Sequence, residues 1–160
     1  ISLVAIYCLR QLVDAFDLRF HHLTDNKYIF QDLLSVLYSN GQPTFLSTVL
    51  KFSLIVVVAP ILEELIHRGY FMNTFFPQSK YYLDVILSAL IFGLSHLILT
   101  HRDPISFIIY SLGGFFYALV YRWTRNLKIT ILCHSFFNFL IYAKPIWIFV
   151  YNYVYYHFFR

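Results

Sequence analysis

Residues Leu54–Gly69 read LIVVVAPILEELIHRG, an apolar run that passes through Pro60 into two adjacent carboxylates and an arginine. On a helix, Glu64 and Arg68 are four residues apart, so they share one face and can pair. Glu63 points about 100° away from Glu64, because a helix has 3.6 residues per turn. The stretch therefore predicts a helix on which arginine holds one carboxylate while the other faces a cavity. An ordinary surface ion pair is the alternative interpretation.

The composition around this stretch is that of a membrane protein. Apolar residues make up 59% of the chain and charged residues 12%, against about 45–50% and about 25% in soluble domains. A chain of 160 residues could not bury that much apolar surface in one water-soluble core. The net charge of +4 comes from Lys and Arg scattered at segment ends. This pattern favours contact with lipid headgroups and argues against nucleic acid as a partner.

This stretch belongs to the first of five apolar segments, which are separated by short polar links. The segments are Thr44–Phe76, Tyr82–Thr100, Ile105–Trp123, Leu127–Ala143 and Ile146–Phe159. A spanning helix needs about 20 mostly apolar residues, and Pro60 predicts a kink or break in the first, longer segment. We therefore predict an all-α, polytopic transmembrane bundle of about five to six spans.

The whole chain, 1–160, is expected to form a single membrane domain with an interfacial or loop region at 14–43. This region is the most polar stretch of the sequence, and it contains a short candidate interfacial helix. The chain starts at Ile1 and has one methionine, Met72. We therefore expect the sequence to be truncated at its N-terminus.

Two further segments carry ionisable or amide side chains at helical spacing. Phe92 and His96 share one face of the second segment, and His134 and Asn138 share one face of the fourth. Taken singly, each polar residue is explained as well by packing or by hydrogen bonds between helices. Polar groups inside a span are costly, however, so we expect these faces to be buried against the carboxylates of the first segment.

Such a site would hold the groups that a hydrolase needs. A carboxylate could act as a base, an imidazole could share the proton or hold water, and His134 and Asn138 could donate hydrogen bonds to an oxyanion. The sequence has no His-Glu-x-x-His zinc motif and no aspartate in the middle of a span. An activated water molecule is therefore the nucleophile that we expect.

The spacing Glu63-Glu64-x-x-x-Arg68, Phe92-x-x-x-His96 and His134-x-x-x-Asn138 resembles the three-motif signature of a known family. This is the CAAX protease and bacteriocin-processing (CPBP, or Abi) family, which includes the Rce1-type prenyl-protein endopeptidases. The resemblance covers roughly 53–142, and it implies a protease core at 45–142.

The resemblance also implies roles for the matching residues. Glu63 would activate water with the help of His96, while His134 and Asn138 would stabilise the oxyanion. Glu64, Arg68 and Phe92 would support the site. A divalent metal such as zinc, held by Glu63, His96 and His134, is an open alternative, although metal-independent activation is favoured here because asparagine rarely binds zinc.

The predicted function is that of an intramembrane endopeptidase in a bacterial plasma membrane. Its partners would be the lipid bilayer and a peptide or protein substrate in the membrane, with a role in bacteriocin maturation or self-immunity as one extension. The main alternative is a non-catalytic bacteriocin immunity or scaffold protein that uses the same polar cluster to join its helices. A small transporter is a third interpretation, which the lack of a paired, broken-helix repeat disfavours.

Overall fold

The computed structural model describes residues 45–99 and 104–159, together with a few single positions between 4 and 15. Within these ranges the regular structure is entirely helical, with no strand, which confirms the all-α class for this part of the chain. The predicted interfacial or loop region at 14–43 lies outside the described residues, apart from Ala15.

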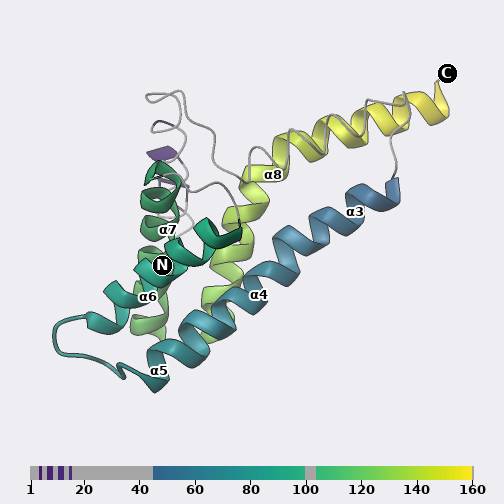
Figure 1. Ribbon diagram of the computed structural model, residues 1–160. Coiled ribbons are helices and arrows are strands. Elements are labelled where there is room, and N and C mark those ends of the chain that lie inside the picture. Colours follow the sequence, from purple (N-terminus) through teal and green to yellow (C-terminus); the bar gives the residue numbers. More distant parts are fainter. Residues whose placement is uncertain are drawn as a thin grey trace.

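The motif with two carboxylates lies on a long, uninterrupted helix. Figure 1 shows it as one diagonal rod, built from the consecutive elements α3 (Phe45–Ser53), η1 (Leu54–Val58), α4 (Ala59–Glu64), η2 (Leu65–Phe71) and α5 (Met72–Thr74). The segments η1 and η2 are π-helical, so their hydrogen bonds run from residue i to residue i+5. The predicted break at Pro60 does not occur, since helical structure runs from η1 through the proline into α4. The N–H that proline lacks is replaced by the side chain of Asn138, which donates to the carbonyl of Ile55.

Three further helices complete the described chain: α6 (Leu83–Leu99), α7 (Pro104–Thr124) and α8 (Leu127–Phe158). The link from α7 to α8 is a tight turn, as its sequence predicts. Arg125 has a positive φ of 49°, a common way to end a helix. The Asn126 side chain then caps α8 by accepting a hydrogen bond from the Lys128 N–H at 3.0 Å.

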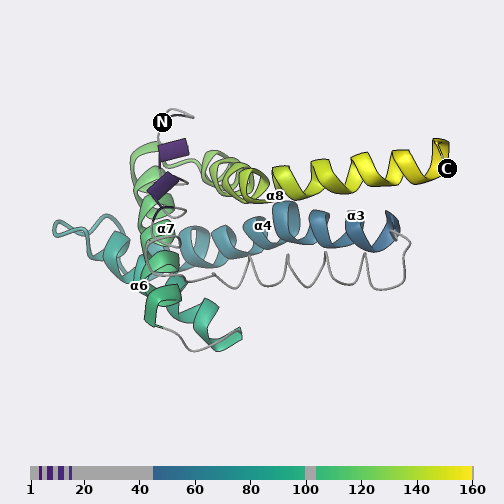
Figure 2. The same cartoon turned by 90° about the horizontal axis from the view of Figure 1, so that it is seen from above.

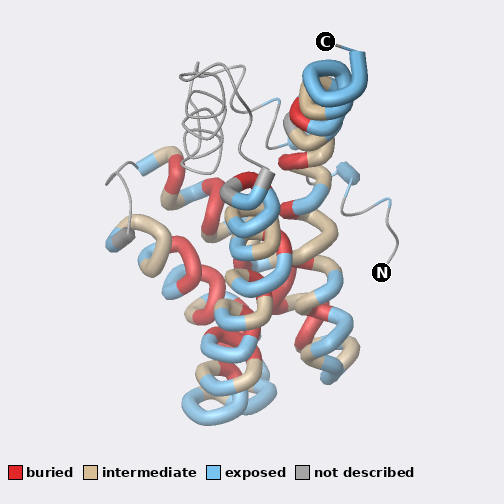
Figure 3. Tube along the Cα trace, turned by 90° about the vertical axis from the view of Figure 1, so that its right-hand side faces the viewer, coloured by how far each residue is buried: buried red, intermediate tan, exposed pale blue. Residues whose placement is uncertain are grey.

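The helices meet around the middle of the long rod. Helix α6 packs against α7, while η1 and α4 pack against α8. Figures 1 and 2 show that α3 and the distal part of α8 project from the same side of this crossing. Buried residues, drawn red in Figure 3, gather where the helices cross. One apolar cluster there joins Met72, Val85, Ala118 and Tyr121.

Of the described helices, α7 alone is both long and apolar enough to cross a bilayer as it stands. Helix α8 adds a second span if its arms, Leu127–Ala143 and Ile146–Phe158, count as one despite a 52° bend between them. Helix α6 is shorter, and the long rod carries three buried or half-buried charges in its middle. The predicted five to six spans are therefore not confirmed in the described ranges.

Candidate active site

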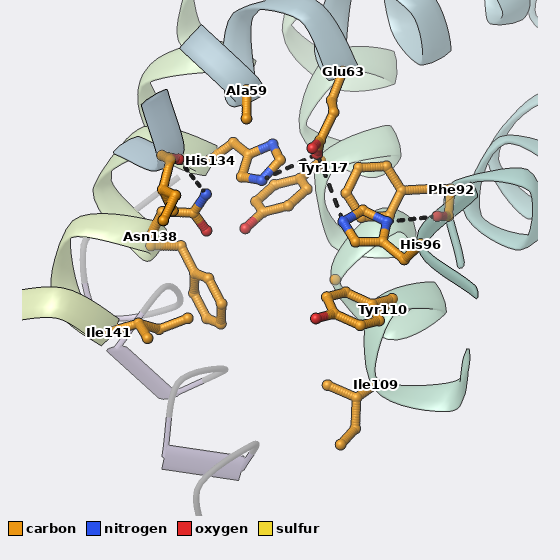
Figure 4. Close-up of a pocket in the computed structure, with 13 residues that line it drawn as sticks. Ala59, Glu63, Phe92, His96, Ile109, Tyr110, Tyr117, His134, Asn138 and Ile141 are labelled. Carbon is orange, nitrogen blue, oxygen red and sulfur yellow. Dashed lines mark hydrogen bonds and ion pairs between the residues drawn. The ribbon is translucent and has the colours of Figure 1, made fainter. Parts of the chain in front are cut away.

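The predicted polar faces converge on one internal cavity of about 120 Å³. Figure 4 shows Glu63 of α4, His96 of α6 and His134 of α8 around its upper part, with Asn138 beside them. Phe92 also lines the cavity, and its ring lies 4.6 Å from that of His96. Three separate helices thus contribute side chains to one cavity, as the helical spacing predicts.

Glu64 and Arg68 do not line this cavity but contact residues that do. Both side chains are fully buried, and Arg68 Nη1 donates to Glu64 Oε1 at 3.2 Å, which confirms the predicted pair. Arg68 Nη2 donates to the carbonyl of Gly114 in α7, and its guanidinium lies 4.9 Å from the centre of the Phe92 ring. The pair therefore ties the long rod to α6 and α7.

The hydrogen bonds of the two histidines fix which ring nitrogen carries a proton. His96 Nδ1 lies 2.9 Å from the Phe92 carbonyl oxygen, and His134 Nδ1 lies 2.8 Å from Glu64 Oε1. Both partners are acceptors, so each Nδ1 must be the donor. In the neutral rings, each Nε2 then carries a lone pair.

Both Nε2 atoms point toward the same oxygen of Glu63. Glu63 Oε2 lies 3.9 Å from Nε2 of His96 and 3.7 Å from Nε2 of His134. Among the described residues this buried oxygen has no hydrogen-bond partner. Three acceptors therefore surround one point, and such an arrangement needs a donor between them, as a bridging water molecule would provide.

The Asn138 side chain is anchored by the carbonyl group of Ile55, which has no backbone donor because residue 60 is proline. In η1 the N–H of Ala59 bonds to Leu54 O, five residues earlier. In the same register the donor for Ile55 O would be residue 60, but proline has no N–H. Asn138 Nδ2 donates to Ile55 O instead, at 3.0 Å. The second N–H of the amide stays available at the edge of the cavity.

Helix α7 supplies residues that the sequence did not single out. The Tyr117 ring stacks on His134 with centroids 4.3 Å apart, and the Tyr110 ring stacks on His96 at 4.1 Å. Gly113 lines the cavity between them. The three positions are related by steps of three and four residues, so they occupy one helical face. This spacing could have identified the three residues as one helical face in the sequence, but it is also typical of ordinary core positions.

The donor types around Glu63 also suit a metal ion. The Nδ1 hydrogen bonds of His96 and His134 resemble those that orient zinc-binding histidines. Two ligands of a tetrahedral zinc lie roughly 3.4 Å apart, slightly less than the separations given above. As the side chains stand, no group of three potential ligands in the described ranges has metal-binding geometry.

The described helices bring a carboxylate, two imidazoles and an amide together around one cavity, and these are the groups of a hydrolase-like site. Residues 45–140 match the family model "Type II CAAX prenyl endopeptidase Rce1-like". The chain belongs to this family of membrane peptidases, as the motif spacing predicted. The matched range contains every residue of the site described above.

Two curated relatives are similar to parts of the chain. An uncharacterised protein of Mycoplasma capricolum subsp. capricolum is 32% identical over 109 residues, which are 68% of this chain and 31% of the relative. The Bacillus subtilis protein named "Putative membrane peptidase YdiL" is 29% identical over 82 residues, which are 51% of this chain and 32% of the relative. The chain thus matches about a third of the length of each. No solved structure is significantly similar.

Proposed function

We propose that this chain carries the catalytic centre of an intramembrane endopeptidase of a bacterial plasma membrane, in which Glu63 activates the attacking water. The observation that carries the proposal is the convergence of Glu63 Oε2 with the Nε2 atoms of His96 and His134. A water molecule at this point could donate one hydrogen bond to the carboxylate and the other to an imidazole. Its oxygen would then face the cavity.

In the proposed reaction, the water oxygen bonds to the carbonyl carbon of a peptide while Glu63 takes one proton from the water. The carbonyl electron pair moves to its oxygen and forms a tetrahedral oxyanion. When the C–N bond breaks, the proton held by Glu63 passes to the leaving amine. Water is thus consumed, and the products are a carboxylic acid and an amine.

Two groups near the water are candidates for stabilising the oxyanion. Asn138 can donate its second amide N–H, because only one is used by Ile55 O. His134 would donate from Nε2 only when both ring nitrogens carry a proton.

A divalent metal such as zinc is the alternative to a free water molecule. Glu63, His96 and His134 would hold it, and it would supply Lewis-acid activation of a bound water. The donor types fit this role, whereas the separations would have to contract. A chelator separates the two versions, since metal-free water activation would survive dialysis against it.

The test is cleavage of a broad peptide library by the purified full-length protein, compared with its Glu63→Gln variant. We expect the variant to fold normally and to lose about 10²–10⁴-fold in rate, the usual contribution of a general base. Leu62→Ala is the matched control, because Leu62 precedes Glu63 but is 54% exposed on the outer surface of the bundle. Full activity in Glu63→Gln would refute the mechanism.

The same variant separates catalysis from an immunity or scaffold function. If the protein protects cells from a bacteriocin, a catalytic mechanism predicts that Glu63→Gln abolishes protection while the protein still accumulates. A scaffold that uses the polar cluster only to join helices predicts that protection is lost only when accumulation is lost.

A further inference from the structure

Gly113 is the one glycine of α7 whose missing side chain leaves open space. A Cβ atom built there would meet nothing within 4 Å. The next residue differs, since a Cβ on Gly114 would lie 2.9 Å from Phe92 Cβ. Close packing therefore explains Gly114 but not Gly113. A glycine inside a helix costs roughly 0.5–1 kcal/mol relative to alanine, so the space at Gly113 calls for another explanation.

The open space at Gly113 belongs to the cavity of the candidate active site. Tyr110 and Tyr117, which share its helical face, stack on the two histidines. A side chain at position 113 would thus project between these two stacks. It would take up part of the volume that a bound peptide has available next to Glu63.

The cavity has a polar end and an apolar end. Figure 4 shows Glu63 and His134 at one end, and Ile109 and Ile141 at the other. Ile55 and Phe137 add further apolar lining. A buried apolar cavity of about 150 Å³ can hold one benzene molecule, so about 120 Å³ suits one aromatic or branched side chain.

We propose that Gly113 opens an apolar subsite that receives one large apolar side chain flanking the scissile bond, and that the size of residue 113 sets the size of that side chain. The inference rests on the proposed peptidase function, which it refines. A larger residue at 113 would shift preference toward substrates with small side chains. With glycine at position 113, substrates that carry Phe or Leu next to the scissile bond would be favoured.

The test measures peptide binding, so it does not depend on turnover. Full-length protein carrying Glu63→Gln is titrated with fluorescent peptides that differ only in one residue, Ala, Leu or Phe. With glycine at 113, we expect the Phe peptide to bind at least ten-fold more tightly than the Ala peptide, because burial of apolar area favours it. Gly113→Leu should remove this preference and leave affinity for the Ala peptide within about three-fold.

Two further variants control for indirect effects. Gly113→Ala should give an intermediate preference and raise thermal stability slightly, since alanine favours a helix. Leu112→Phe adds bulk at a neighbouring α7 position that is 54% exposed, so it should leave the preference unchanged. If Gly113→Leu fails to fold, Gly113→Ala still provides the comparison.

The outcomes separate this inference from the peptidase function itself. Equal loss of affinity for all peptides in the Gly113 variants, an unchanged preference, or no peptide binding at all would overturn the subsite. Size-selective binding that depends on residue 113, combined with no cleavage by the wild-type protein, would support the subsite and refute the peptidase function.

Discussion

Glu63 and Glu64 are consecutive residues of the same type, yet they lie in opposite environments. The Glu64 side chain is 0% exposed, and its Oε1 accepts from both Arg68 and His134. The Glu63 side chain is 28% exposed, and its Oε2 faces two histidine nitrogens without a donor. Because a helix turns about 100° per residue, adjacent positions can serve different neighbours. One carboxylate is committed to the structure, while the other is left for a ligand.

The largest effect is expected from Glu64→Gln, compared with the same substitution at the neighbouring Glu63. Glu64→Gln leaves Arg68 buried without its counter-charge, and breaking a buried pair in this way costs about 3–5 kcal/mol. We expect a large fall in the thermal unfolding midpoint in detergent, or failure to accumulate. Glu63→Gln should leave the midpoint close to that of the wild type and affect cleavage instead.

A double variant tests whether the lost charge balance is the cause. Glu64→Gln combined with Arg68→Met removes both charges, and replacing a buried pair by neutral groups is often nearly neutral for stability. The double variant should therefore be more stable than Glu64→Gln alone. If it is less stable, the two residues contribute through packing rather than as a charge pair.

A smaller effect is expected at Asn138, which both anchors the long rod through Ile55 O and lines the candidate active site. Asn138→Ala leaves Ile55 O without a donor, which should cost about 1–3 kcal/mol of stability. It also removes a candidate oxyanion donor, which should lower the cleavage rate about 10²–10³-fold. Thermal unfolding and peptide cleavage measure these two effects separately.

Adding Pro60→Ala to Asn138→Ala should separate the anchoring role from the catalytic one. Alanine at position 60 supplies a backbone N–H in the register of Ile55 O, so stability should recover while cleavage should not. Recovery of both would mean that Asn138 acts only as an anchor. Recovery of neither would contradict the proposed link between Pro60 and Asn138.

The smallest effect is expected at the aromatic contact of His134. Tyr117→Leu removes the stacked ring and should lower kcat about two- to ten-fold, in line with about 0.5–1.5 kcal/mol for an aromatic pair. Tyr117→Phe keeps the ring and should retain activity within about two-fold. Equal losses in both variants would assign the effect to the hydroxyl group rather than to stacking.

The convergence of the polar faces could be predicted from sequence because it follows from helical spacing alone. Glu64 and Arg68, Phe92 and His96, and His134 and Asn138 are each four residues apart, and burial of polar groups in lipid favours their contact. The family could be predicted from the same spacing. The catalytic roles of these residues stay predictions, as does the boundary of the proposed 45–142 core.

Other features could not be predicted because they depend on tertiary contacts. Tyr110, Gly113 and Tyr117 look like ordinary residues of an apolar helix until their neighbours are known. The anchoring of Asn138 depends on the π-helical register before Pro60, and sequence periodicity does not reveal such a register. The predicted number of spans rests on apolar runs in the sequence. In the described ranges α6 is too short for a span and the long rod carries charged residues, so fewer helices meet the length and hydropathy of a spanning helix.

The two π-helical segments that flank the carboxylates also mark places where the rod can change in length. Hydrogen bonds in η1 and η2 run over five residues, so each of their turns holds about one residue more than an α-helical turn. Removing one residue from η1 would therefore let this segment become α-helical with little rotation of α3 relative to Glu63. Insertions and deletions at these two segments should thus leave the orientation of Glu63 nearly unchanged, whereas the same change within α4 would turn Glu63 by about 100°.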